Sequence, residues 1–294
     1  MVALAIGAAA GFSTPIGGML ILAAGLAGFR FLASGRERSR FTQRKRWSYL
    51  AGVLLLAGVE SWPALELARN WSVTAYVSHN LVIVLAAVPL ILLGIPSSRY
   101  RRLLDLPAAG ALARALSRPI TATVAYTALM VASMLPPVVA LQARSVIALI
   151  YLQLLLLVAG VALWLPALQL LPATRRLSTG ARVGYLVAQS LVPSIPAIAL
   201  IFAHHSFYPG FARGAHLLFG VSAVADQQLA GVVSKLLNLG VLWTVAVRIL
   251  VKASNREAAG EDPEPMTWAD VERELRERRP PRGDQPGESP RSPG

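Results

Sequence analysis

Long apolar stretches separated by short basic segments are the feature that most restricts how this chain can fold. Several stretches of roughly 18 to 25 residues carry almost no charge, which is the length an α-helix needs to cross the hydrocarbon core of a bilayer. The stretches are continuous rather than alternating, so they do not fit the short strands of a membrane barrel. The chain is therefore predicted to be an all-α polytopic membrane protein.

The boundaries of the apolar stretches predict about seven transmembrane helices within residues 1–252. The expected spans are 13–34, 47–66, 73–95, 119–140, 145–167, 183–204 and 227–250. Residues 253–294 are expected to form a cytoplasmic tail with a short helix at about 267–279. The end of this tail is rich in Pro, Gly, Ser and charged residues, so it is predicted to be disordered.

The number of basic residues alternates from one predicted connection to the next. The first, third and fifth connections contain six, five and three Lys or Arg, whereas the second, fourth and sixth contain one each, Arg69, Arg144 and Arg213. Because Lys and Arg accumulate on the cytoplasmic side, the N-terminus is predicted outside the cytoplasm and the C-terminus inside. Orientation thus accounts for the formal charge of +13, and we expect no nucleic acid as a partner.

Several activities have no support in the sequence. The chain has no cysteine, which excludes disulfides, thiolate metal sites and CxxC redox chemistry. It contains neither an HExxH motif nor a plausible Ser–His pair, so we do not expect an enzyme. A retinal protein would need a carboxylate counter-ion in its third helix, and the predicted third span has no Asp or Glu.

Polar residues of the predicted spans gather in their extracytoplasmic halves, while the inner halves are largely Leu, Val, Ala and Ile. His79 lies in the third span, where a buried imidazole can bind a metal ion or a proton. Asp226 and Gln227 open the last span, where Asp226 acts either as the N-cap of that helix or as a functional carboxylate. Lys235 either snorkels outward or pairs with Glu60 or Asp226. The asymmetry predicts an outward-opening polar pocket for an ion, a small ligand or a partner protein.

Five short landmarks follow one another along these spans. They are Gly28-Phe29-Arg30-Phe31-Leu32, then Ser78-His79-Asn80-Leu81 with Leu93-Gly94-Ile95-Pro96, then Ala162-Leu163-Trp164-Leu165-Pro166, then Phe207-Tyr208-Pro209-Gly210-Phe211, and finally Asp226-Gln227-Gln228-Leu229-Ala230-Gly231. With these landmarks, most of residues 13–250 resembles the CtaG-like cytochrome c oxidase assembly factors, a family of seven-helix bacterial membrane proteins.

The resemblance implies a membrane accessory factor for cytochrome c oxidase assembly, with copper delivery at the extracytoplasmic face. It also implies a multi-pass protein of the cell (plasma) membrane whose partners are the lipid bilayer and subunits of the oxidase. His79 is the candidate metal ligand. The other functional candidates are Asp226, Gln227, Lys235 and Tyr208.

The chain also departs from the family pattern. Family members tend to carry a second histidine one turn before the histidine of the third span, and that position is Ala75 here. In the fifth span, where the family usually has another histidine, this chain offers Tyr151 or Gln153. Two alternatives stay open: a small-molecule or ion transporter, and a metal-independent membrane scaffold of the same fold.

Overall fold

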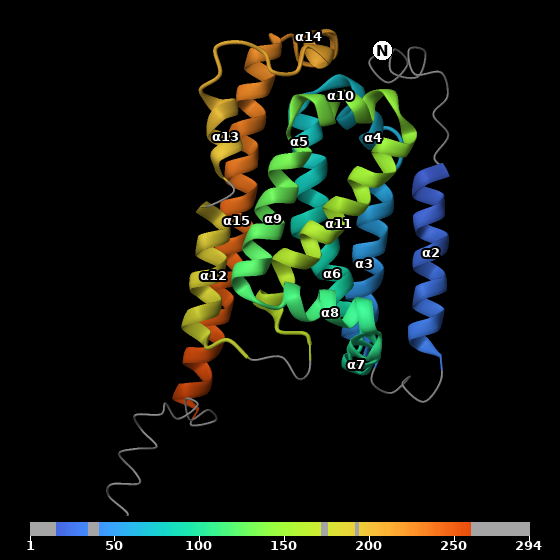
Figure 1. Ribbon diagram of the computed structural model, residues 1–294, viewed down its shortest axis with the longest axis vertical. Coiled ribbons are helices and arrows are strands. Elements are labelled where there is room, and N and C mark those ends of the chain that lie inside the picture. The colour runs from blue at the N-terminus through green and yellow to red at the C-terminus, as the bar shows by residue number, and fades with distance from the viewer. Residues whose placement is uncertain (1–15, 35–40, 172–175, 192–193, 260–294) are drawn as a thin grey trace, which may run out of the picture. The chain divides into compact units, whose positions relative to one another are not determined.

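The computed structural model describes residues 16–34, 41–171, 176–191 and 194–259, and all regular structure within them is helical (Figure 1). The elements up to residue 116 are α2 (Ile16–Ala33), α3 (Gln43–Val59), α4 (Ala64–Glu66), η2 (Leu67–Trp71), α5 (Val73–Val82), η3 (Ile83–Ala87), α6 (Val88–Gly94), α7 (Ser97–Asp105) and α8 (Pro107–Leu116). Those that follow are α9 (Pro119–Ser133), α10 (Pro136–Arg144), α11 (Val146–Leu168), α12 (Thr179–Leu191), α13 (Ser194–Ile201), η4 (Pro209–Phe211), α14 (Ala212–Phe219) and α15 (Ala223–Ala258).

The contacts of the chain divide it into a unit that ends at Leu250 and a unit that begins at Val251. Of the second unit, only the last turns of α15 are described. The predicted tail helix at 267–279 lies outside the described residues.

Helix length and composition support part of the predicted topology. Four helices are long and apolar enough to cross a membrane, or up to six if each of two bent pairs is one span. The four are Val73–Gly94, Val146–Leu168, Thr179–Ile201 and Ala223–Ala258. The remaining candidate is the shorter apolar helix α2, so the number seven and the orientation stay predictions.

Two pairs of helices are bent at a short break. α3 and the α4–η2 segment meet at 56°, and α9 and α10 meet at 64°. The second bend falls at Leu135-Pro136-Pro137, because proline cannot donate a backbone hydrogen bond and keeps the residue before it out of the helical region. α9 therefore ends at Ser133, and the predicted span 119–140 is a bent pair of helices rather than one straight helix.

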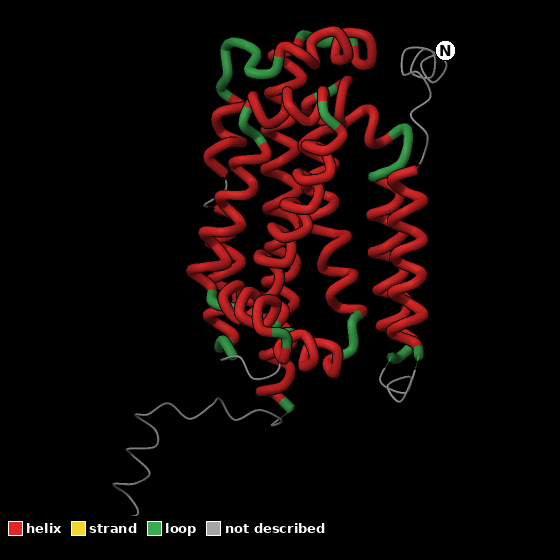
Figure 2. Tube along the Cα trace, turned by 45° about the vertical axis from the view of Figure 1, so that its right-hand side comes forward, coloured by secondary structure: helices red, strands yellow, loops and turns green. Residues whose placement is uncertain are grey.

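The short helices gather at the two ends of the long ones. Figure 1 shows α4, α10 and α14 at one end, and α7 and α8 at the other. We call the first end the α10 end. Figure 2 shows the long helices running side by side between the two ends. The α10 end contains Arg69, Arg144 and Arg213, the basic residues of the connections predicted to be extracytoplasmic.

The buried core forms around the continuous helix α5–η3–α6, against which α3 and α11 pack, and α9 packs on α11. Trp164 of α11 is almost fully buried, and its indole N–H donates to the carbonyl of Val84 in η3 at 2.8 Å. Buried Trp side chains usually need such a partner. Pro166, two residues after Trp164, has no N–H for the carbonyl of Ala162. The Tyr185 hydroxyl of α12 approaches that carbonyl at 3.3 Å, so a side chain replaces the missing backbone donor.

A small residue in α3 allows the close approach of α6. A Cβ atom built on Gly52 would lie 2.9 Å from the carbonyl oxygen of Ala87 and 2.8 Å from the backbone nitrogen of Ile91. Gly58 lies in the same helix, and a Cβ there would meet nothing within 4 Å.

We predict that Gly52→Ala destabilises the protein by about 1–3 kcal/mol, because the new methyl group forces two helices apart. Gly58→Ala is the matched control and is expected to be neutral or slightly stabilising, since alanine favours a helix over glycine. Thermal unfolding of both variants in detergent measures the difference. Equal melting temperatures would contradict the close packing of α3 on α6.

Candidate functional site

Asp226 lies in the first turn of α15 with its side chain fully buried. Its carboxylate accepts hydrogen bonds from the Ser72 hydroxyl at 2.8 Å and from the backbone N–H of Val73 at 2.7 Å. The Thr74 hydroxyl donates in turn to the backbone carbonyl of Asp226 at 2.8 Å. The carboxylate therefore caps the N-terminus of α5, where unpaired N–H groups and the helix dipole favour a negative charge.

Capping of its own helix, one of the two roles left open for Asp226, belongs to another residue. The Ser222 hydroxyl accepts from the N–H of Ala225 at 3.1 Å, so Ser222 serves the first turn of α15. Asp226 instead joins two helices that are far apart in the sequence. Its partner could not be deduced from the sequence, because capping rules describe contacts within a few residues.

Gln227 and Gln228 form hydrogen bonds with the segment that precedes η4. The Gln227 side chain accepts from the N–H of Phe207 at 2.8 Å and donates to the carbonyl of His205 at 3.3 Å. Gln228 donates to the carbonyl of Ala203 at 3.0 Å. The Asp-Gln-Gln run thus holds both the start of α5 and the loop after α13, which explains structurally why these three polar residues follow one another.

Tyr208 ties the same loop to the end of α9. Its hydroxyl donates to the carbonyl of Met134 at 2.5 Å, at the bend between α9 and α10. Burial raises the pKa of Tyr208 to about 12, so the phenol stays a neutral donor at physiological pH. Tyr76 of α5 makes the equivalent bond to the carbonyl of Ser133. Two hydroxyls therefore satisfy carbonyls left open where the helix stops.

His79 faces Glu60, a residue that the sequence analysis did not include among its site candidates. The His79 Nε2 and Glu60 Oε1 atoms are 3.5 Å apart, and both side chains are buried. That separation is longer than a good hydrogen bond, and neither atom has another hydrogen-bond partner. The other ring nitrogen, Nδ1, lies 3.4 Å from the Asn80 side-chain oxygen. The sequence feature that could have indicated this pair is a carboxylate at the end of one predicted span followed by a histidine in the next.

Lys235 is placed apart from these two groups. Its ammonium group donates to the carbonyl of Ser190 in α12 at 3.3 Å. Asp226 is occupied by α5 and Glu60 lies beside His79, so the structure does not bring Lys235 to either predicted partner.

Although the inner halves of the predicted spans are largely apolar, a layer of buried polar side chains lies between α9, α12 and α15. Gln189 donates to the Thr123 hydroxyl at 2.9 Å, and Asn238 donates to the Tyr126 hydroxyl at 3.3 Å. These residues belong to stretches that are far apart in the sequence. Only the packing of three separate helices brings them together.

Few side chains of the described residues could bind a copper ion. No group of three or more His, Cys, Asp or Glu comes together in the described part of the chain. Ala75 provides no ligand, and Tyr151 is 65% exposed on α11. His79 and Glu60 supply one imidazole nitrogen and one carboxylate oxygen. Cu(I) prefers thiolate, thioether and imidazole ligands, so this pair is a weak fit for stable copper binding.

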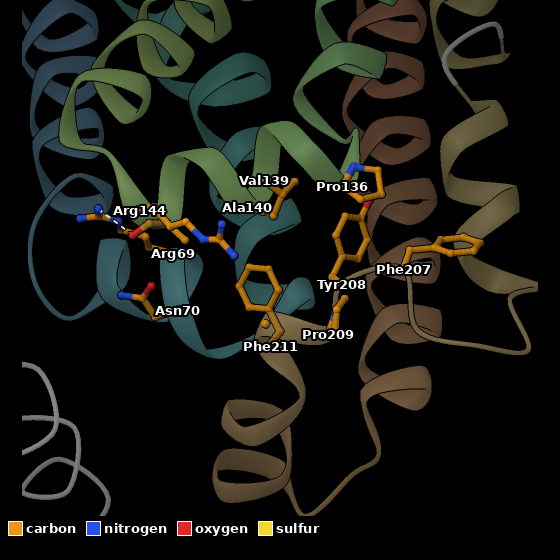
Figure 3. A pocket seen from close by; sticks show the side chains of 12 residues that line it. Arg69, Asn70, Pro136, Val139, Ala140, Arg144, Phe207, Tyr208, Pro209 and Phe211 are labelled. Atoms are coloured by element: carbon orange, nitrogen blue, oxygen red, sulfur yellow. Dashed lines mark hydrogen bonds between the residues drawn. The ribbon is translucent and has the colours of Figure 1, made fainter.

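A cavity of about 380 Å³ opens at the α10 end. Its lining comes from η2, α10 and the loop that enters η4. Figure 3 shows Arg69, Arg144 and Asn70 on one side of Phe211, with Tyr208 and Pro136 on the other. A polar pocket was predicted among the extracytoplasmic halves of the spans, but Arg69 and Arg144 were not among its candidate residues, because in the sequence they indicate only orientation.

We predict that Asp226→Ala lowers stability by about 2–3 kcal/mol, because several donors at the start of α5 lose a charged acceptor. Glu66→Ala is the control, since the Glu66 carboxylate accepts only an exposed hydrogen bond from Asn70, and it should change stability by less than about 0.5 kcal/mol. Denaturation in detergent compares the two. A larger loss for Glu66→Ala would overturn the assignment of Asp226 as the cap of α5.

Comparison with known proteins gives one result. A model of the cytochrome c oxidase caa3 assembly factor family (Caa3_CtaG) matches residues 26–256. No curated protein and no solved structure matches. The matched stretch covers most of the 294 residues and includes Glu60, His79, Tyr208 and Asp226. The chain therefore belongs to the cytochrome c oxidase caa3 assembly factor family.

Proposed function

We propose that this chain is a membrane accessory factor for the assembly of cytochrome c oxidase. The observation that carries the proposal is the family match over residues 26–256, which includes every element of the α10 end. The protein acts without catalysis, and its partners are the bilayer and subunits of the oxidase. The charge asymmetry of the connections supports the extracytoplasmic side as the place where the α10 end meets these subunits.

We propose further that copper is a cargo that the chain holds only transiently, between Nε2 of His79 and Oε1 of Glu60. The separation of 3.5 Å and the lack of other hydrogen-bond partners for both atoms favour this position. Two ligand atoms, one of them a hard carboxylate oxygen, give weak retention of Cu(I). Weak retention suits delivery, because a carrier must release its ion.

The test is the oxidase content of the native host, measured from the haem spectrum of its membranes. Deleting the gene should remove most of the assembled oxidase, and the wild-type gene should restore it. His79→Ala and Glu60→Gln should restore less than about a tenth at limiting copper, a loss of about 1.4 kcal/mol in effective copper binding. Added copper should recover both variants by mass action.

His216→Ala is the control, because His216 is an exposed histidine of α14 at the same end of the molecule. It should behave as wild type at every copper concentration, and immunoblots of membranes check that all variants accumulate equally. Unchanged oxidase after the deletion would refute the assembly function. Full activity of His79→Ala at limiting copper would refute copper delivery but not the assembly function. It would favour the metal-independent scaffold.

A further inference from the structure

The arginines of the α10 end are not spread evenly over it. The connections predicted to be extracytoplasmic contain only three basic residues, Arg69, Arg144 and Arg213. Arg69 and Arg144 both line the cavity at this end, although they come from different connections. The positive-inside bias keeps basic residues away from this side. Because two of the three nevertheless line one cavity, we infer that this cavity needs positive charge.

The two arginines differ in how they are held. The Arg69 guanidinium donates to the carbonyls of Gln142 and Ala143 at 3.1 and 3.0 Å, which fixes it against the last turn of α10. Arg144, the last residue of α10, is exposed at the mouth of the cavity. None of the described lining residues is acidic. The cavity therefore favours an anion, and a guanidinium group is well suited to bind the oxygens of a phosphate.

An apolar groove continues from this cavity along α9. A second hollow of about 410 Å³ shares Pro136, Phe207 and Tyr208 with the first and runs between α9 and α13. A third hollow shares Thr127 and Val131 with the second and follows α9 away from the α10 end. Figure 3 shows Tyr208 and Phe207, which also line the second hollow, on the opposite side of Phe211 from the arginines.

The dimensions of the groove fit one leaflet of a bilayer. Its lining extends from Leu135, at the bend after α9, to Thr123, a distance of about 18 Å at the helical rise. The hydrocarbon of one leaflet is about 15 Å thick. A positively charged site for a head group, next to an apolar groove of this length, matches the polarity and the length of an anionic phospholipid.

We propose that the α10 end binds one anionic phospholipid of the extracytoplasmic leaflet. Its phosphate lies at Arg144 and Arg69, and an acyl chain follows the groove between α9 and α13. This site goes beyond the proposed function and does not depend on it. The lipid would contact the loop around Tyr208, which lines both hollows.

The test measures binding of short-chain lipids to the full chain in detergent, by native mass spectrometry and by thermal stabilisation. Dioctanoyl phosphatidylglycerol should bind about tenfold more tightly than dioctanoyl phosphatidylcholine, and Arg144→Gln should remove this preference. Arg213→Gln is the matched control, because Arg213 is an exposed arginine of the same end that does not line the cavity. It should bind both lipids as wild type does.

Two further arms separate the sources of the anion. Inorganic phosphate at the same concentration should not compete with the lipid, since it lacks the acyl chain. Ala199→Trp, which fills the groove, should weaken both lipids, whereas Ala51→Trp on the exposed face of α3 should not. Equal lipid affinities in wild type and Arg144→Gln would overturn the proposal. Phosphate binding as tight as that of the anionic lipid would also overturn it, and would leave a site for a free anion.

Discussion

The bond between the Asp226 carboxylate and the N-terminus of α5 is the interaction on which the rest of this structure depends. In a bilayer, unpaired backbone groups find no water, so every helix end needs a partner from the protein. Asp226 supplies a charged acceptor to Val73 and Ser72 within a fully buried contact. Because α5 continues into η3 and α6, this contact sets the depth of His79 and of the whole central helix. The position of the His79–Glu60 pair follows from it.

The same requirement is met by other side chains at each break of a long helix. Tyr76 and Tyr208 serve the carbonyls at the end of α9, Tyr185 serves the turn opened by Pro166, and Arg69 serves the end of α10. The α10 end is therefore an ordered assembly of irregular segments. Against this background, the buried imidazole of His79 and carboxylate of Glu60 are among the few groups without good hydrogen bonds, and such exceptions are where function is expected.

The sequence predicted those features that arise from local composition. The third and fifth spans agree within a residue or two with Val73–Gly94 and Val146–Leu168, because their apolar runs are uninterrupted. The bend at Pro136 was not predicted, because the residues beyond it are also apolar. Asp226 was recognised as important, but its partner lies 154 residues away. Gln189 and Asn238 were missed for the same reason, since only tertiary packing makes them neighbours.

The absence of cysteine from the chain allows a direct measurement of the central contact. A double variant, Ser72→Cys with Asp226→Cys, should form a disulfide in native membranes on mild oxidation, because the two side chains are in hydrogen-bond contact. Ser72→Cys with Lys235→Cys is the control, since Lys235 lies nine residues further along α15, about 13 Å at the helical rise. Cross-linking of the first pair alone is the predicted result. Cross-linking of the control pair, with none at Asp226, would contradict the capping of α5 by α15.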